Sequence, residues 1–214
     1  MKIFLDTADV AEVQKHFGTG LIDGVTTNPT LILKSGRQPR DVYRELQLLG
    51  VRDVSMEIVG DTPYIVSEAH KLQEEFGDMT TIKVPCTKEG LLACKELSRE
   101  NIRTNVTLIF SAAQAILAAK AGATYVSPFV GRCDDNSVAG LEVVRSISEV
   151  YGRQAVRTQV LAASIRDVYK VTRAFYNGAN VVTMPPKIFE KMYDHVLTRE
   201  GVAQFDQDWA ASAR

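Results

Sequence analysis

The 214-residue sequence predicts an α/β fold, a single (β/α)8 barrel, on three observations. Eight short apolar runs recur from one end of the chain to the other, and segments with helical periodicity separate them. No linker or low-complexity stretch divides the sequence. With about 27 residues per repeat, each unit has room for one strand, one helix and two short loops. We therefore expect one domain over residues 1–214.

The eight apolar runs are the predicted strands. Strands separated by helices pair in parallel, and repeated right-handed βαβ units close most simply into a TIM barrel. An open doubly wound sheet is the alternative, but it usually has fewer strands, and no GxGxxG turn follows any run. The runs span residues 2–6, 24–28, 54–59, 80–84, 104–109, 125–130, 158–162 and 181–184.

Start and stop signals indicate the helices between the runs. Residues 9–12 and 111–114 resemble capping boxes, which satisfy backbone N–H groups at a helix start. Thr62 predicts an N-cap before Pro63, and Pro39 predicts another helix start. Glycines after apolar-periodic stretches predict helix ends at Gly50, Gly77, Gly122, Gly152 and Gly178.

An extra helix is predicted after the eighth run, at about residues 200–212. Val202, Phe205 and Trp209 are spaced i, i+3 and i+7, so they form one apolar stripe. This stripe packs either on its own barrel or on a neighbouring subunit.

Composition excludes several classes of function. The chain has 25 basic and 26 acidic residues without a Lys/Arg block, which disfavours nucleic acid and anionic membranes as partners. Its apolar stretches are too short for a membrane span, and Asp6 comes too early for a signal peptide. Three cysteines without a CxxC pair favour a reducing cytoplasm over a disulfide framework or a zinc site. The three histidines show no ligand spacing, so we expect them at the surface and predict no metal.

Polar residues stand at the ends of nearly all the runs. Parallel barrel strands are buried on both faces, so an ionisable residue within one is costly unless it serves a site. Barrel active sites lie at the C-terminal ends of the strands, where these residues converge. They are Asp6, Thr7, Thr26, Asn28, Glu57, Lys83, Asn105, Thr107, Ser127 and Ser164.

Lys83 is the candidate nucleophile. Apolar neighbours flank it, and a desolvated lysine releases its proton more readily, so that the neutral amine can attack a carbonyl. The alternative is an edge-strand lysine that faces solvent. Asp6 and Glu57 supply two acid/base groups for such chemistry, unless one of them only forms an ion pair with Lys83. Cys86 and Cys133 lie near the same strand ends, but no histidine base accompanies them.

Arg132, Ser164 and Arg166 follow the sixth and seventh runs. Two guanidinium groups, a hydroxyl and helix N-terminal amides suit a phosphate dianion. We therefore predict a phosphate site there, although lone arginines usually end in surface ion pairs.

Six motifs extend this pattern over essentially the whole chain: FLDTA (4–8), GVTTNP (24–29), IKVP (82–85), NVTLIFS (105–111), SPFVGR (127–132) and AASIR (162–166). In this order they resemble the transaldolase family, in its short single-barrel branch, which includes fructose-6-phosphate aldolases. The resemblance implies a reaction without a cofactor, in which Lys83 forms a Schiff base with the C2 carbonyl of fructose 6-phosphate or sedoheptulose 7-phosphate. A dihydroxyacetone unit then passes to erythrose 4-phosphate or glyceraldehyde 3-phosphate, as in the pentose phosphate pathway.

The resemblance also implies roles for the other residues. Asp6 handles the proton of the hydroxyl at the cleaved bond, and Glu57 serves Schiff-base formation with a water held by Thr107. The remaining substrate contacts are Thr26, Asn28, Asn105, Ser127 and Phe129 at the sugar and Arg132, Ser164 and Arg166 at the phosphate.

Phe129, Glu57, Asn105 and Ser127 resemble the transferases of the family more than its aldolases, which tend to carry tyrosine and glutamine at the first two positions. An aldolase that releases free dihydroxyacetone is the alternative, and a non-catalytic phosphosugar-binding barrel is a third. Relatives of the short branch resemble decamers of two pentamer rings, which implies a homo-oligomer, decamer or pentamer, joined through the terminal helix.

Overall fold

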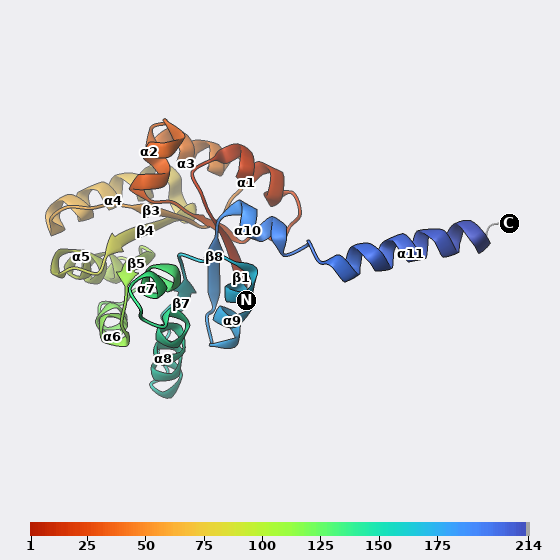
Figure 1. The fold of residues 1–214 in the computed structure, drawn as a ribbon. Helices are drawn as coiled ribbons and strands as arrows, with labels where there is room; N and C mark the ends of the chain where they lie inside the picture. The colour runs from red at the N-terminus through yellow and green to blue at the C-terminus, as the bar shows by residue number, and fades with distance from the viewer. Residues whose placement is uncertain (213–214) are drawn as a thin grey trace.

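The chain forms a closed barrel of eight parallel strands in sequence order, which confirms the predicted fold (Figure 1). The computed structural model describes residues 1–212, so the last two residues of the expected 1–214 domain lie outside it. One strand lies at each predicted run, and the fourth strand extends one residue beyond its run, to Pro85. The strands are β1 (Lys2–Asp6), β2 (Gly24–Thr26), β3 (Val54–Glu57), β4 (Thr80–Pro85), β5 (Thr104–Ile109), β6 (Tyr125–Pro128), β7 (Gln159–Ala162) and β8 (Val181–Met184).

Helices surround the barrel and cover the outer faces of its strands (Figure 1). They are α1 (Val10–Phe17), α2 (Pro29–Ser35), α3 (Pro39–Leu48), α4 (Thr62–Phe76), α5 (Lys88–Arg99), α6 (Ala112–Lys120), α7 (Val130–Asp135), α8 (Gly140–Arg153), α9 (Val168–Tyr176) and α10 (Pro186–Lys191), with a 3-10 turn at Gly77–Met79. A last helix, α11 (Val196–Ser212), does not cover the barrel.

The predicted N-caps at Asp9 and Ser111 are confirmed, but neither forms the complete capping box, because Asp9 N–H donates to Thr7 and Gln114 accepts from Phe110 N–H. The Asp9 carboxylate accepts from two backbone N–H groups at the start of α1, and the Ser111 hydroxyl accepts from one at the start of α6. Pro39 is the first residue of α3, as predicted. The cap expected at Thr62 is wrong, because the Asp61 carboxylate one residue earlier accepts the Tyr64 N–H at 2.9 Å.

Gly152 does not end a helix. It lies inside α8, which continues to Arg153, and Ala155 adopts the positive φ of 49° beyond the helix. The other four predicted glycines do adopt the positive φ expected after a helix.

Side chains fill the inside of the barrel in layers. Alternate residues of a strand share a face, so Phe4 lies one layer below Asp6 and Tyr125 one layer below Ser127. Phe4, Tyr125 and Leu161 belong to one buried apolar cluster. The polar residues at the C-terminal strand ends therefore stand on a packed floor.

A buried carboxylate stabilises the opposite end of the barrel. Asp53 precedes β3 and accepts hydrogen bonds from the hydroxyls of Thr81 and Tyr125, each at 2.8 Å, and from the Arg103 guanidinium at 2.9 Å. These three donors satisfy the carboxylate, so Asp53 closes the N-terminal end without forming a site.

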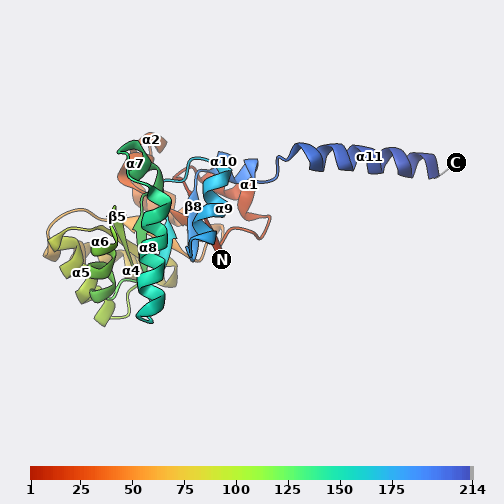
Figure 2. The ribbon, with the colours of Figure 1, turned by 60° about the horizontal axis from the view of Figure 1, so that its bottom comes forward.

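The terminal helix α11 extends away from the barrel (Figures 1 and 2). It begins at Val196, directly after the connection 192–195 and four residues before the predicted start. No residue of α11 up to Ser212 is buried, and Val202, Phe205 and Trp209 are 52%, 66% and 77% exposed. The apolar stripe therefore does not pack on its own barrel.

Among residues 1–212, every helix falls short of the length or the apolar content that a bilayer crossing demands.

Candidate active site

A cavity of about 100 Å³ opens at the C-terminal ends of the strands. Most of the predicted site residues line it, and they come from strands all around the barrel: Asp6, Thr26, Asn28, Lys83, Thr107, Ser127, Phe129, Arg132 and Ser164. Thr183, Leu161 and Ala163 also line the cavity, although the sequence analysis did not single them out. Of the three, only Thr183 had a signal, as a polar residue within an apolar run.

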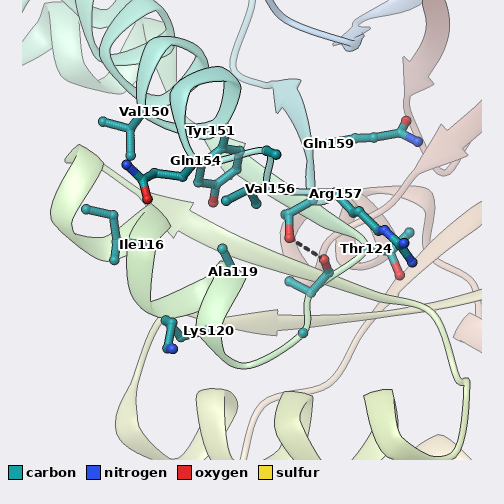
Figure 3. Close-up of a pocket in the computed structure, with 14 residues that line it drawn as sticks. Ile116, Ala119, Lys120, Thr124, Val150, Tyr151, Gln154, Val156, Arg157 and Gln159 are labelled. Carbon is teal, nitrogen blue, oxygen red and sulfur yellow. Dashed lines mark hydrogen bonds between the residues drawn. The ribbon is translucent and has the colours of Figure 1, made fainter.

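Size alone does not identify the site. A larger hollow lies between α6 and α8, near the N-terminal ends of β6 and β7 (Figure 3). Its lining is mainly apolar, although it includes Lys120 and Arg157, and it contains none of the predicted catalytic residues. The chemistry-bearing residues gather at the other end of the barrel.

Lys83 lies inside the barrel on β4, with 4% of its surface exposed. Its Nζ donates to the Thr27 carbonyl at 2.8 Å and lies 3.0 Å from the Glu57 carboxylate. The register of β3 and β4 places Glu57 directly beside Lys83. A solvent-facing edge lysine, the alternative from the sequence, is wrong because a closed barrel has no edge strand.

Asp6 is the second carboxylate near Lys83. Burial raises its pKa above the ordinary 3.8, while the positive charge of Lys83 and a hydrogen bond from the Thr26 hydroxyl, at 2.9 Å, partly offset that rise. The Thr26 hydroxyl is also 2.7 Å from that of Thr183. Asp6 is thus oriented by a threonine pair and biased toward keeping a proton.

Thr107 has a buried hydroxyl without a hydrogen-bond partner among the described residues. A buried hydroxyl left unpaired is costly, and this one faces the cavity. The backbone beside it is irregular, because β5 changes register between Val106 and Ile109 and Leu108 adopts a φ of 58°. Such bulges and strained residues gather at functional sites. Thr107 is therefore placed to bind a water or a substrate atom.

Asn105 lies beneath the cavity rather than in its wall. Its amide accepts from the Ser127 hydroxyl at 2.6 Å and donates to the Ser55 hydroxyl at 3.1 Å. The register places it beside Lys83 on β5. In this arrangement Asn105 orients Ser127, which does line the cavity.

The predicted phosphate residues separate into two groups. Arg132 lies over the Phe129 ring, with its guanidinium carbon 4.9 Å from the ring centroid, and lines the cavity with Ser164. Arg166 is half-exposed and forms a two-pronged ion pair with Asp135 outside the cavity lining.

Gly131 brings the two groups together. A Cβ on Gly131 would lie 2.4 Å from the Ser164 carbonyl oxygen and 2.6 Å from Arg166 Nε, so glycine lets the Ser164 backbone and the Arg166 side chain approach α7. Ser164 itself adopts a left-handed φ of 58°. The two basic groups therefore flank one end of the cavity, although Asp135 holds one of them.

Asn28 and the cysteines have other roles in the fold as well. The Asn28 side chain caps α2 by accepting the Leu31 N–H at 2.9 Å, while the residue lines the cavity. Burial raises the pKa of the Cys86 and Cys133 thiols, which disfavours the reactive thiolate of either residue.

Comparisons with known proteins agree with this geometry. The model of the family described as "Transaldolase/Fructose-6-phosphate aldolase" matches residues 3–214. A protein of Paracoccus denitrificans named "Probable transaldolase" is 47% identical over 214 residues, which are 100% of this chain and 99% of the relative. Proteins with the same name from Caulobacter vibrioides and Brachyspira hyodysenteriae are each 45% identical, with coverage of 99–100% of this chain and 98–99% of theirs. With a closed barrel, a buried lysine flanked by carboxylates, and these matches over the full length, the chain belongs to the transaldolase/fructose-6-phosphate aldolase family.

Proposed function

We propose that this enzyme of the transaldolase family transfers a dihydroxyacetone unit between sugar phosphates through a Schiff base on Lys83. One observation carries the proposal. The Lys83 amine is enclosed in the barrel at 3.0 Å from the Glu57 carboxylate, and Asp6 lines the same cavity. An amine away from water, with two carboxylates to move protons, is what addition to a ketone and carbon–carbon cleavage require.

The first stage forms the Schiff base. The Lys83 amine adds to the C2 carbonyl of the ketose phosphate and gives a carbinolamine, which loses water to form an iminium. Glu57 and a water held by the Thr107 hydroxyl carry the protons of this exchange. Glu57 lies beside the amine through the β3–β4 register, and Thr107 lines the same cavity as Lys83.

The second stage breaks the bond between C3 and C4. The Asp6 carboxylate takes the proton of the C4 hydroxyl, the electron pair of the bond moves to the iminium, and an aldose phosphate leaves. The enamine left on Lys83 then attacks the aldehyde of an acceptor, and Asp6 returns the proton. A carboxyl whose pKa is raised by burial suits both directions of this transfer.

Substrate binding uses the remaining cavity residues. Asn28, Thr26 and Ser127 hold the hydroxyls of the dihydroxyacetone unit, and Asn105 acts through Ser127. Arg132 and Ser164 bind the phosphate together with Arg166, whose partner Asp135 gives way to the dianion. We infer sedoheptulose 7-phosphate or fructose 6-phosphate as donors and glyceraldehyde 3-phosphate or erythrose 4-phosphate as acceptors. These are sugar phosphates of the cytoplasmic pentose phosphate pathway.

Phe129 favours transfer over release. Its ring packs edge-on against Phe110, with centroids 6.0 Å apart, and has no hydroxyl that could orient a hydrolytic water. The dihydroxyacetone unit then stays bound to Lys83 until an acceptor aldehyde reacts with it. An aldolase that frees dihydroxyacetone remains the second candidate function, and acceptor dependence separates the two.

The terminal helix supports an assembly of several chains. A free stripe of Val202, Phe205 and Trp209 is unusual on a soluble surface and suits a neighbouring subunit. We propose that α11 packs on the next subunit in a pentamer ring or in a decamer of two rings.

The Schiff base gives the first prediction. Borohydride reduction of the enzyme with fructose 6-phosphate is expected to leave a stable adduct that peptide mapping locates on Lys83. Lys83→Met should lose both the adduct and the activity, while Lys88→Met, an exposed lysine nearby, should keep both. If the parent enzyme gives no adduct, the chain is a non-catalytic barrel.

The second prediction concerns acceptor dependence. Cleavage of fructose 6-phosphate should accelerate about tenfold or more when glyceraldehyde 3-phosphate is added. The acceptor reacts with the enamine on Lys83 and so frees the enzyme for another turnover. Phe129→Tyr should raise the release of free dihydroxyacetone, whereas Phe110→Tyr, on the neighbouring ring, should not. Equal rates with and without acceptor in the parent would identify an aldolase.

The third prediction follows from Asp6. Asp6→Asn should lower kcat about 10²- to 10⁴-fold, since the proton carrier is lost. Its melting temperature relative to the parent should rise with pH. Below the ordinary pKa of 3.8, position 6 is neutral in both proteins. As the pH rises from there, the folded parent loses stability because its buried Asp6 resists ionisation, while Asp6→Asn has no such loss.

Circular dichroism melts between pH 4 and pH 8 measure this difference. Asp41→Asn, which alters an exposed carboxylate, is the control and should show no such increase. A relative stability of Asp6→Asn that falls as the pH rises would contradict the argument.

The fourth prediction concerns assembly. Sedimentation equilibrium should find a pentamer or decamer for the parent, and Phe205→Asp with Trp209→Asp should dissociate it by placing charge in the buried stripe. Gln207→Asp, on the opposite side of α11, should leave the assembly intact. A monomeric parent would refute the proposal.

A further inference from the structure

Three possible metal ligands converge outside the catalytic cavity, where α1 packs beside α10. They are Glu12 and His16 of α1 and Glu190 of α10, whose ligand atoms all lie within 4.8 Å of one another. The surface position expected for His16 is wrong. The residue is 5% exposed, because its ring packs edge-on against Phe189 with centroids 5.3 Å apart.

The buried imidazole has an unsatisfied nitrogen. His16 Nε2 has no hydrogen-bond partner within residues 1–212, yet it faces two carboxylates, with Glu190 at 3.5 Å and Glu12 at 3.7 Å. Both separations are long for a hydrogen bond. They do match two ligands of one ion, since donor atoms around a tetrahedral zinc with bonds of about 2.1 Å lie about 3.4 Å apart.

We propose that Glu12, His16 and Glu190 bind a divalent transition-metal ion of the zinc class, with water as the fourth ligand. One imidazole and two carboxylates form a donor set that such ions accept. The i, i+4 spacing of Glu12 and His16 places both side chains on one face of α1. The carboxylates are 42% and 43% exposed, so an ion can enter from solvent.

Lys15 holds the competing charge. Its ammonium forms an ion pair with the Glu190 carboxylate, and the metal takes the place of that contact. The Lys15 side chain is 58% exposed, so it can swing into solvent without loss of packing. Metal and Lys15 therefore compete for one carboxylate.

The ion would fix the base of the terminal helix. A connection of four residues joins α10 to α11, and Phe189 and Tyr193 pack edge-on at this junction with centroids 5.4 Å apart. A metal that joins α10 to α1 therefore holds the root of the helix proposed to reach a neighbour. Asp6 precedes α1 and His16 lies in its last turn, so the ion is distinct from the catalytic groups.

Zinc binding to the metal-stripped full chain, without a histidine tag, tests the site. Calorimetry should give one Zn²⁺ per chain, Co²⁺ should give the intense visible absorption of tetrahedral coordination, and Zn²⁺ should raise the melting temperature. Glu190→Gln and Glu12→Gln alter half-exposed residues and should fold, yet should weaken Zn²⁺ binding about 100-fold. The control His70→Asn changes an exposed histidine beside Glu100 and should bind as the parent does.

Lys15→Met provides a test in the opposite direction. It removes the competing ammonium and should tighten Zn²⁺ binding about tenfold. The proposal is overturned if the parent binds no Zn²⁺, or if Glu190→Gln binds it as tightly as the parent, since the ion would then sit elsewhere, for example on a cysteine. Neither result would affect the Schiff-base proposal, which the Lys83 adduct tests independently.

Discussion

The closure of eight parallel strands into a barrel is the constraint on which the arrangement of the candidate active site depends. Closure leaves no edge at which a charged side chain could reach water, so an inward-facing lysine must find its partners inside. Lys83 finds the Thr27 carbonyl and the Glu57 carboxylate on the neighbouring strands. A buried pair of this kind is weak evidence for stability, because desolvation offsets the attraction between the charges. We propose that the pair is kept in the core for the Schiff-base chemistry assigned to Lys83 rather than for stability.

Much of the fold and part of the site can be predicted from the sequence, because a closed barrel restricts where charged residues can lie. Apolar runs spaced by helical segments leave few alternatives to a barrel, and a charged residue within such a run must face the inside near a strand end. Lys83 and Asp6 were identified in this way, whereas the role of Thr107 came from the family resemblance, and the three residues line one cavity. The orphaned Thr107 hydroxyl then adds what the sequence could not show, a buried polar atom with no partner in the described part of the chain.

Other features depend on contacts between residues far apart in sequence, which no local pattern encodes. Asp135 forms an ion pair with Arg166, 31 positions later in the sequence. The ring of Phe189, near the other end of the chain, packs on His16. For the same reason, no local pattern indicated that Glu190 lies beside His16. Asp53 shows the limit of the polar-residue argument: it is as buried as the site residues, but three donors satisfy it at the other end of the barrel.

The most direct measurement is a crystal structure of the enzyme reduced by borohydride in the presence of its donor. Continuous density should join Lys83 Nζ to the substrate carbon, with the Asp6 carboxylate at the hydroxyl of the cleaved bond and a water on Thr107 Oγ1. An adduct on another lysine, or one in which Asp6 and Thr107 touch neither substrate nor water, would contradict the account.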